Sequence, residues 1–232
     1  MSVTPEATNA APSLVPTKAV PRVAVVLSGR GSTFRALHDA VLAGGVSAEV
    51  CGVFSDKPAA YGLEIARERG LPVFALSPHE FADREAFDAA FGELIAATAP
   101  DWILLAGYMR ILTPGFCERF AGRLLNIHPS LLPLYPGLHT YERALADGRT
   151  EHGSTVHFVT AELDGGPLIA QVRVPIVAGD TADSLSARVQ AAERKLYPTV
   201  AGWAAAGRLS WNAGNPQFDG VPLLQPLEVP AP

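Results

Sequence analysis

Cysteine is scarce in this chain of 232 residues, and the two that occur, Cys51 and Cys117, do not share a CxxC spacing. The count excludes a disulfide-stabilised scaffold and a zinc ribbon, and it is typical of a protein from a reducing compartment. A basic surplus is also missing, because 18 Lys and Arg stand against 23 Asp and Glu, for a net charge of −5. Since nucleic-acid-binding modules are normally basic, we expect no nucleic-acid partner.

Long apolar runs are absent as well. The longest stretch without Asp, Glu, Lys or Arg, residues 124–141, contains three prolines and two histidines, which a membrane-spanning helix does not tolerate. The first residues lack the basic and apolar regions of a secretory signal. The sequence therefore predicts a cytoplasmic protein without a membrane partner.

Hydrophobic residues nevertheless make up 48% of the chain, enough for a packed core. In the first half, short β-branched apolar runs alternate with segments of helical periodicity. We expect strands over residues 22–28, 49–54, 72–76, 102–106 and 123–128, and helices over residues 33–43, 61–69 and 81–98. This alternation predicts an α/β fold with a doubly wound, mostly parallel sheet.

The second half breaks the alternation. Residues 155–160 and 168–175 are strand-like and lie too close in sequence for a crossover helix between them. They are therefore expected to pair antiparallel, through a short Asp-Gly-Gly-Pro turn, as an addition to the sheet. A helix is predicted over residues 181–195, continuing after Pro198 as residues 199–206.

The two ends of the chain differ from its body. Residues 1–21 are rich in Ala, Pro and Thr without periodicity, and we expect a mobile leader there. Residues 212–232 contain five prolines and are expected to form a tail that follows the surface or is loose. Residues 22–211 remain as a single domain.

A glycine-rich turn, Ser28-Gly29-Arg30-Gly31-Ser32-Thr33, lies between the first predicted strand and the first predicted helix. Backbone N–H groups at a helix N-terminus attract anions, and glycine lets a phosphate approach closely. The turn is neither a P-loop nor a full dinucleotide fingerprint, which needs glycine where Phe34 stands. A single phosphate fits better, while the same residues also suit a tight turn with a capped helix and no ligand.

Polar residues gather at the end of the fifth predicted strand. Asn126 and His128 share one side of that strand, and ligands of open parallel sheets bind at the carboxyl ends of strands. An amide beside an imidazole is able to hold an oxyanion and move a proton. Asp164 offers a carboxylate for His128, although Asp-Gly is also a common turn pair. A hydrogen-bonded pair without a catalytic role is the alternative.

Other chemistry has weaker signals. Four of the six histidines lie within residues 128–157, but neither HxxxH nor HExxH occurs, so we expect no metal. His139 is expected to contact substrate or to order its loop. Arg84 and Arg110 are candidates for a carboxylated ligand, with ordinary surface charge as the alternative. A serine hydrolase is not expected, since no Gly-x-Ser-x-Gly element occurs.

Four segments, taken in order and spacing, resemble the phosphoribosylglycinamide formyltransferase family. They are SGRGS after the first strand, LAGYMRIL, NIHPSLLPLYPGLHTYERAL and EHGSTVHFVTAELDGGP, and the resemblance covers about residues 22–211. The NIHPSLLP and DGGP elements also occur across the wider formyltransferase superfamily, whereas the SGxGS start and the single-domain length point to this family. The resemblance implies a doubly wound sheet with an antiparallel addition, in agreement with the pattern above.

The resemblance also implies a reaction, namely formyl transfer from 10-formyltetrahydrofolate to the amine of glycinamide ribonucleotide in purine synthesis. By that resemblance, Asn126 donates a hydrogen bond to the tetrahedral oxyanion, and His128 acts as general acid and electrostatic stabiliser. Asp164 holds His128 in a useful protonation state and helps to manage the proton of the amine. The folate is then a co-substrate, no metal is involved, and small molecules are the partners of a monomer or homodimer.

The binding residues implied by the resemblance fall in both halves of the body, with 22–120 as the phosphate- and nucleotide-binding half and 121–211 as the folate and catalytic half. The residues that match the contacts to phosphate and glycinamide are Gly31, Ser32, Thr33, Gln190 and Glu193. The residues that match the folate pocket are Arg84, Met109, Arg110, Ile111, Leu112, Asn126, Thr160, Ala161, Glu162, Leu163 and Asp164. The family usually has Asn where this chain has Thr33, and its core has no counterpart of the leader.

Three alternatives stay in view. A 10-formyltetrahydrofolate hydrolase would use the same three catalytic residues, but such enzymes typically carry a regulatory domain before the catalytic one. A transferase acting on initiator methionyl-tRNA would need a carboxyl-terminal RNA-binding domain and a basic surface. A folate- or nucleotide-binding module without catalysis would not need the combination of Asn126, His128 and Asp164.

Overall fold

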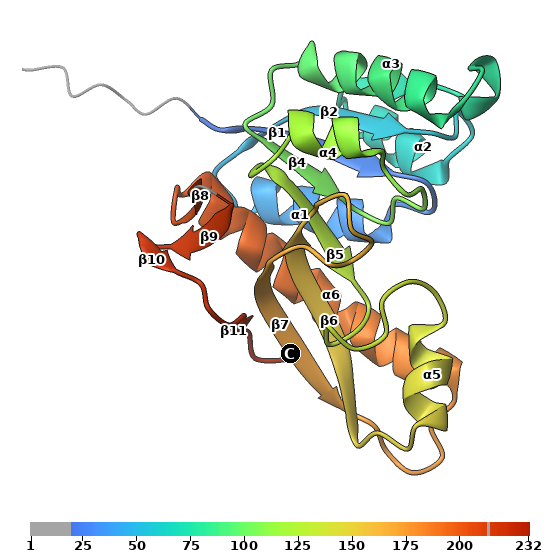
Figure 1. The fold of residues 1–232 in the computed structure, drawn as a ribbon, viewed down its shortest axis with the longest axis vertical. Helices are drawn as coiled ribbons and strands as arrows, with labels where there is room; N and C mark the ends of the chain where they lie inside the picture. The colour runs from blue at the N-terminus through green and yellow to red at the C-terminus, as the bar shows by residue number, and fades with distance from the viewer. Residues whose placement is uncertain (1–19, 213) are drawn as a thin grey trace, which may run out of the picture.

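An eight-stranded mixed sheet organises the chain (Figure 1). The structure, a computed structural model, describes residues 20–212 and 214–232, so the predicted leader lies outside it except for Val20 and Pro21. The strands are β1 (Arg22–Leu27), β2 (Glu49–Ser55), β3 (Val73–Ala75), β4 (Trp102–Leu105), β5 (Leu124–His128), β6 (Glu151–Phe158), β7 (Leu168–Pro175), β8 (Leu209–Asn212), β9 (Asn215–Phe218), β10 (Val221–Pro222) and β11 (Leu227–Glu228).

The order of the main sheet is β11-β7-β6-β5-β4-β1-β2-β3. The pairs from β5 through β4, β1 and β2 to β3 are parallel, whereas β6 pairs antiparallel with both β5 and β7. The predicted fold class, a mostly parallel α/β sheet with an antiparallel addition, is therefore confirmed. A second sheet of three strands, β10-β9-β8, follows the last helix.

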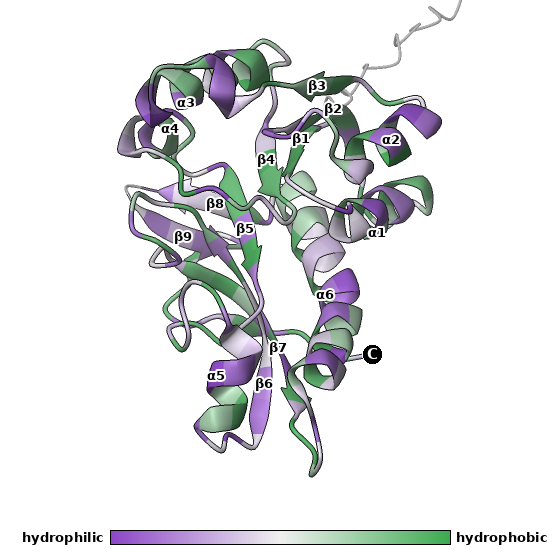
Figure 2. Ribbon diagram, turned by 90° about the vertical axis from the view of Figure 1, so that its right-hand side faces the viewer, coloured by the Kyte–Doolittle hydropathy of each residue, from purple (hydrophilic) through white to green (hydrophobic). Residues whose placement is uncertain are grey.

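Helices cover both faces of the main sheet. They are α1 (Ser32–Leu42), α2 (Tyr61–Glu68), α3 (Arg84–Ala96), α4 (Pro114–Arg119), α5 (Thr140–Ala146) and α6 (Ala182–Ala205), with a 3-10 turn at Pro78–Glu80. Residues of α1, α2 and α6 pack in one core cluster, which includes the fully buried Phe34, Leu63 and Tyr197. Residues of α3 and α4 pack in a second cluster, around Phe91 and Phe116. In Figure 2 the helices α1, α2 and α3 carry both hydrophilic and hydrophobic colour, as amphipathic helices do.

Several boundaries differ from the sequence prediction. The third predicted helix begins at Arg84 rather than residue 81, because the Asp83 carboxylate caps it by accepting a hydrogen bond from the Ala86 N–H at 2.7 Å. Helix α6 runs unbroken through Pro198, since its buried face continues on both sides of the proline. The connection between β6 and β7 spans residues 159–167 and is a loop rather than a tight hairpin turn. The short helices α4 and α5 were not predicted.

The carboxyl-terminal residues contain β9, β10 and β11, which the sequence pattern did not predict. Strand β11 joins the main sheet by pairing parallel with β7 at Ala170 and Gln171. The Val229 side chain is buried and the Val229 N–H donates to the Gln171 carbonyl at 2.8 Å. Short strands of this kind depend on partners far away in sequence, so local pattern does not reveal them.

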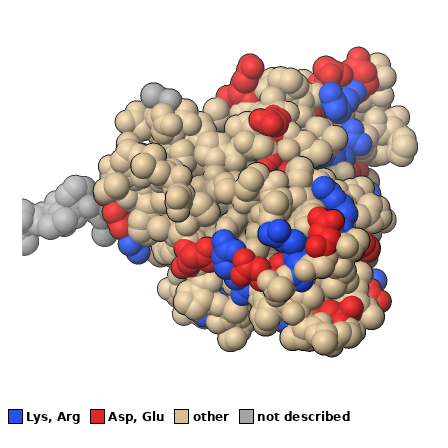
Figure 3. Space-filling view, turned by 60° about the horizontal axis from the view of Figure 1, so that its bottom comes forward, with Lys and Arg blue, Asp and Glu red and all other residues tan. Residues whose placement is uncertain are grey.

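Charge is distributed in pairs over the surface. On the face shown in Figure 3, acidic and basic side chains lie close to one another. Ion pairs include Arg208 with Asp219 at 2.6 Å and Arg188 with Asp180 at 2.9 Å. Within residues 20–212 and 214–232, no helix has both the length and the apolar character needed to cross a bilayer.

Candidate active site

The carboxyl ends of β1, β4 and β5 meet at one edge of the sheet, because these strands are parallel neighbours. The glycine-rich turn follows β1, a loop over residues 106–113 follows β4, and β5 ends on His128 (Figure 1). This is the edge at which open α/β sheets bind ligands. The predicted polar residues of distant segments are therefore brought together here.

His128 is buried, with both ring nitrogens facing oxygen atoms. Its Nε2 lies 2.9 Å from the Tyr135 carbonyl, and its Nδ1 lies 3.4 Å from Oδ2 of Asp164. A carbonyl only accepts, so Nε2 carries a hydrogen and donates it. A bare lone pair on Nδ1 would then face a carboxylate oxygen, so the geometry favours a proton between Nδ1 and Asp164. The ring is thus equipped to supply that proton to a ligand.

Asn126 is oriented by a second histidine, His157. The Nδ1 of His157 lies 2.8 Å from the Phe158 carbonyl and must donate to it, which leaves Nε2 as the acceptor of the neutral ring. That Nε2 lies 3.1 Å from the Asn126 amide nitrogen, which donates. Burial lowers the pKa of His157, which keeps the ring neutral near pH 7. One amide hydrogen of Asn126 is thereby held, and the other is available to a ligand.

Asp164 lies in a left-handed backbone conformation, with φ of 51°. Its Oδ2 also accepts a hydrogen bond from the Gly137 N–H at 2.8 Å, which joins the 159–167 loop to the loop after β5. Tyr135 and His139 share the left-handed conformation, with φ of 56° and 59°. Non-glycine residues in this region cost energy and cluster at functional sites. The loops around His128 therefore adopt an unfavourable backbone conformation at three residues, as is typical where the positions of side chains matter for function.

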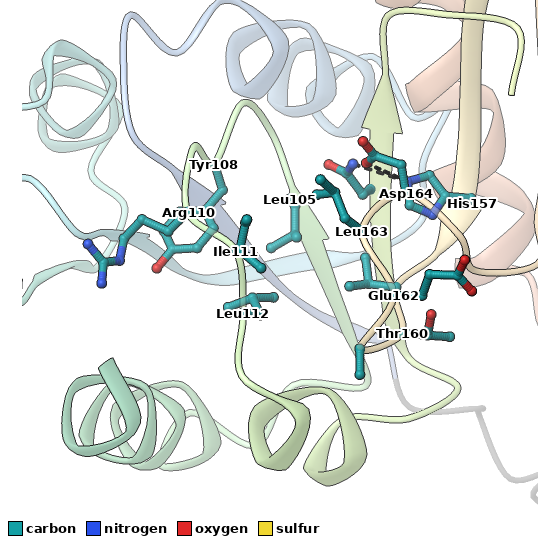
Figure 4. Close-up of a pocket in the computed structure, with 13 residues that line it drawn as sticks. Leu105, Tyr108, Arg110, Ile111, Leu112, His157, Thr160, Glu162, Leu163 and Asp164 are labelled. Carbon is teal, nitrogen blue, oxygen red and sulfur yellow. Dashed lines mark hydrogen bonds and ion pairs between the residues drawn. The ribbon is translucent and has the colours of Figure 1, made fainter. Parts of the chain in front are cut away.

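The largest hollow beside His128, which we call the loop cavity, has a volume of about 460 Å³. It is lined by segments 107–111, 126–129, 137–142 and 163–164. A smaller side recess of about 90 Å³ adjoins it, lined by residues 160–164 together with side chains of the loop after β4. Figure 4 shows this recess, with Asp164 and His157 on one side and Leu105, Ile111 and Leu112 on the other.

The structure brings most of the predicted folate residues to these two hollows. Those that line one or both are Met109, Arg110, Ile111, Leu112, Asn126, Thr160, Ala161, Glu162, Leu163 and Asp164. His139, predicted as an auxiliary residue, lines the loop cavity with a largely exposed side chain. The mouth of the cavity is apolar, because Met109, Leu138 and Leu163 are at least half exposed there.

The two predicted arginines behave differently from each other. The guanidinium of Arg110 lies over the Phe87 ring, 4.8 Å from its centre, and points away from the other labelled side chains in Figure 4. Arg84 begins α3, lies 3.7 Å from Glu85, and lines neither hollow. The structure therefore does not bring Arg84 to the remaining predicted folate residues.

A further hollow, which we call the helix cavity, has a volume of about 310 Å³. Ser32 and Thr33 line it from the start of α1, and Gln190 and Glu193 line it from α6. It shares part of its wall with the loop cavity, and the common residues are Gly107, Met109, Ile127, Pro129 and Tyr141. The two cavities therefore lie next to each other, and their common wall includes the chain neighbours of His128 at the end of β5.

Gly31 forms the start of α1 and is required by geometry. Its φ is 76°, and a Cβ there would lie 2.6 Å from the Cα of Gly62 in α2. Only glycine fits this close crossing of two backbones. The first N–H groups of α1 are thereby presented at the wall of the helix cavity, where an anion is favoured.

Glu193 is the buried acid of the helix cavity. Its Oε1 lies 2.9 Å from the Ser154 hydroxyl. Burial raises the pKa of Glu193 to about 7, against the opposing effects of Ser154 and Arg194. Burial and the nearby Glu193 also raise the pKa of Tyr141 to about 12. The cavity thus holds a carboxyl group that changes charge near neutral pH.

Comparison with known proteins shows the family to which the chain belongs. A family model described as formyl transferase matches residues 21–201. The chain belongs to the formyl transferase family. It is 50% identical to the phosphoribosylglycinamide formyltransferase of Escherichia coli strain K12 over 201 residues, which cover 87% of this chain and 95% of that one. It is 46% identical over 179 residues to the Drosophila melanogaster trifunctional purine biosynthetic protein adenosine-3, covering 76% of this chain and 13% of that one.

Solved structures of the formyl transferase family agree. The phosphoribosylglycinamide formyltransferase of Coxiella burnetii, solved with CHES, superposes with a TM-score of 0.85 at 41% identity, over 89% of this chain and 99% of that one. The glycinamide ribonucleotide transformylase 1 of Symbiobacterium toebii gives 0.82 at 41% identity, over 86% and 94% of the two chains.

Some residues of the candidate site were not singled out by the sequence analysis. Arg30 and Arg194 line the helix cavity, and His157 orients Asn126. Ser28 donates to the Asp56 carboxylate at 2.6 Å and accepts from the Met109 N–H at 3.0 Å, which ties the end of β1 to the loop after β4. Of these, Ser28 and Arg30 had a signal in the sequence, since both belong to the glycine-rich turn and Arg30 places a positive charge within it.

The described part of the chain shows no cluster of side chains suited to bind a metal ion. Residues 20–212 and 214–232 contain no group of three or more His, Cys, Asp or Glu side chains placed to hold an ion. Both thiols are buried, and burial raises the pKa of Cys117 to about 11 and that of Cys51 as well. They therefore stay protonated and unreactive near neutral pH.

Proposed function

We propose that this chain catalyses formyl transfer from 10-formyltetrahydrofolate to the amine of glycinamide ribonucleotide, as a phosphoribosylglycinamide formyltransferase. One observation carries the proposal, which is that Asn126, His128 and Asp164 all line the loop cavity, while Ile127 and Pro129 beside them in sequence line both the loop cavity and the helix cavity. The high identity to a bacterial enzyme of that name, along almost the whole length of that enzyme, supports it. The expected setting is the cytoplasm, with small-molecule partners and a monomer or homodimer.

The ribonucleotide occupies the helix cavity in this proposal. Its phosphate lies against the N–H groups of Ser32 and Thr33, where the helix terminus favours an anion. The guanidinium of Arg30 adds a full positive charge beside it. Gln190 and Glu193 on α6 then face the glycinamide part, which directs the amine toward the shared wall of the two cavities.

The folate occupies the loop cavity and its side recess. The apolar lining from Met109, Ile111 and Leu163 suits the flat ring system, and the backbone of residues 160–164 offers polar partners at its edge. The formyl group then lies beside Asn126 and His128.

The chemical step follows from the hydrogen-bonding groups. The amine attacks the formyl carbon, a new C–N bond forms, and the carbonyl oxygen becomes an oxyanion that accepts from the free amide hydrogen of Asn126. Imidazolium His128 stabilises that charge, and its Nδ1 proton goes to the folate nitrogen as the old C–N bond breaks. The ammonium proton of the attacking amine passes to Asp164, directly or through water, which restores the shared proton. A single oxyanion donor of this kind typically contributes about 10²–10³-fold in rate.

An absorbance assay of 10-formyltetrahydrofolate consumption tests the proposal. Consumption that depends on glycinamide ribonucleotide is the expected result. Equal consumption without the ribonucleotide would instead establish a hydrolase. No consumption under either condition would leave a binding module and would remove the catalytic roles of Asn126, His128 and Asp164.

A further inference from the structure

Ser154, in the middle of β6, contacts two parts of the candidate site, namely the end of β5 at His128 and Glu193 of the helix cavity. It is fully buried. Its hydroxyl oxygen lies 2.7 Å from the carbonyl oxygen of His128 and 2.9 Å from Oε1 of Glu193. It lines none of the cavities described above. A buried hydroxyl thus bridges the strand end that carries His128 and the acid of the helix cavity.

The two contacts compete for a single hydrogen. A hydroxyl has one hydrogen to donate, and the His128 carbonyl only accepts. If Ser154 donates to that carbonyl, its contact with Glu193 is a hydrogen bond only when the carboxyl is protonated and donates to the hydroxyl oxygen. If Glu193 is ionised, the Ser154 hydrogen turns to the carboxylate. The His128 carbonyl then keeps only its backbone donors, which are the Ser130 N–H at 2.8 Å and the pairing with Thr155 of β6.

We propose that Ser154 is a positioning residue that couples the charge of Glu193 to the hydrogen bonding of the His128 backbone. The inference rests on the proposed function in one respect, which is that the ribonucleotide meets Glu193. A ligand that donates an N–H to Glu193 favours the carboxylate and so turns Ser154 away from the His128 carbonyl. Occupancy of the helix cavity is thereby transmitted to the strand end that holds His128, without a ligand contact to β6.

The groups around Glu193 have opposing effects on the charge of its carboxyl group. Arg194 on α6 favours the carboxylate, whereas burial favours the neutral acid. Tyr141 on α5 lines the same cavity and stays protonated, because burial and the charge of Glu193 raise its pKa to about 12. The Ser154 hydrogen bond from β6 lowers the pKa of Glu193, which burial raises to about 7. Removal of the hydroxyl therefore makes the carboxyl harder to ionise.

The test follows the Glu193 carboxyl by ¹³C NMR or infrared difference spectroscopy in the free protein, with Glu193→Gln used to assign the signal. Ser154→Ala is expected to raise the midpoint of the carboxyl titration by about one pH unit, the effect of losing one charge-assisted hydrogen bond. Ser154→Thr keeps the hydroxyl and should titrate as wild type. The ¹³C resonance of the His128 carbonyl should move with the same midpoint in the wild type and in Ser154→Thr, but not in Ser154→Ala.

Kinetics provide a second measurement. Ser154→Ala should lower kcat/KM for glycinamide ribonucleotide about tenfold, and Ser154→Thr should restore it. In the Glu193→Gln background the same serine substitution should have little further effect, because the coupled partner is gone.

Specific outcomes would overturn the coupling. A carboxyl midpoint unchanged in Ser154→Ala, or a His128 carbonyl resonance in the wild type that ignores the Glu193 titration, would do so. The carbonyl measurement needs only the wild-type protein, so it decides the matter even if the alanine variant fails to fold. Since neither titration uses substrate, a protein that shows the coupling but transfers no formyl group would refute only the proposed function.

Discussion

The hydrogen positions at the centre of the site are set by carbonyl oxygens that only accept. The Tyr135 carbonyl holds Nε2 of His128, which leaves Nδ1 for Asp164. The Phe158 carbonyl holds Nδ1 of His157, which leaves Nε2 for Asn126. In two histidines on neighbouring strands, the backbone carbonyls therefore bind opposite ring nitrogens. One becomes a proton carrier and the other a neutral support for Asn126.

Removal of the proton carrier gives the clearest result at the scale of one residue. His128→Ala is expected to lower kcat by about 10²–10⁴-fold, the usual contribution of a general acid. The measurement is steady-state kinetics, with circular dichroism to verify the fold. His79→Ala, an exposed histidine on the 3-10 turn, is the matched control and should keep wild-type turnover. Turnover near wild type in His128→Ala would remove His128 from the mechanism.

Arg30 tests the phosphate site. It lines the helix cavity, is exposed, and forms no ion pair with any other described residue. Arg30→Ala should raise KM for the ribonucleotide by about three- to tenfold with little change in kcat, because the phosphate is distant from the reacting atoms. The increase should shrink as salt concentration rises.

Arg35, exposed on α1 and outside the cavity lining, provides the control for Arg30. Arg35→Ala makes the same change in net charge and should leave KM unchanged. An equal rise of KM in both variants would mean that overall charge, and not a contact from Arg30, attracts the ribonucleotide.

At the scale of elements, the site depends on how closely α1 and α2 cross. The backbones meet at Gly31 and Gly62, and the Gly62 N–H donates to the Gly29 carbonyl at 3.0 Å. This crossing sets where the first turn of α1 lies relative to α6. The helix cavity is therefore shaped by a contact outside its own wall.

Gly31→Ala should damage both stability and binding. The methyl group would meet the Gly62 backbone at 2.6 Å, and the left-handed φ is unfavourable for alanine, so we expect a loss of at least about 2 kcal/mol in unfolding free energy. Urea denaturation measures the loss, and KM for the ribonucleotide should rise.

Gly29→Ala is the neighbouring control for the Gly31 variant. A Cβ at Gly29 would meet no atom within 4 Å. Its unfolding free energy should stay within about 1 kcal/mol of wild type. Similar losses in both variants would show that the turn is sensitive to any side chain, and that the crossing with Gly62 is not the cause.

At the scale of the whole molecule, Glu193 makes the stability of the fold depend on pH. Its pKa is raised from 4.5 to about 7 in the folded protein, so the unfolded chain binds fewer protons between these values. The contribution to stability is complete below about pH 4.5 and is lost as pH rises through about 7. Since each unit corresponds to about 1.4 kcal/mol, the total loss is on the order of 3–4 kcal/mol, of which about 2–3 kcal/mol falls between pH 5 and pH 8.

Glu193→Gln should remove this pH dependence. Unfolding free energies from urea titrations at pH 5 and pH 8 are compared between the variant and the wild type. The wild type is expected to lose about 2–3 kcal/mol more than the variant over that interval. Buried His152 and His157, whose pKa values burial lowers, are present in both proteins and cancel. Equal pH dependence in the two proteins would contradict a buried, neutral Glu193.

Much of this arrangement could be predicted from sequence, because it depends on short-range pattern. Two-residue alternation placed Asn126 and His128 on one side of β5, and the alternation of strands and helices predicted the parallel sheet. What pattern could not supply is contact between distant segments. The support of Asn126 by His157 and the bridge through Ser154 both depend on the register between β5 and β6. Arg84 was assigned to the folate pocket by the resemblance, yet its place at the start of α3 is set by the cap at Asp83.

The strand β11 bears on whether copies of this protein associate through the edge of the main sheet. Strand β7 would otherwise end the sheet with unpaired backbone groups beside the buried Ala170 and Val172. An open edge of that character is a template on which a strand from another molecule can add. By occupying it at Ala170 and Gln171, the residues after 226 guard against aggregation while contributing no wall to either cavity. The segment thus covers an edge of the sheet and takes no part in the walls of the two cavities.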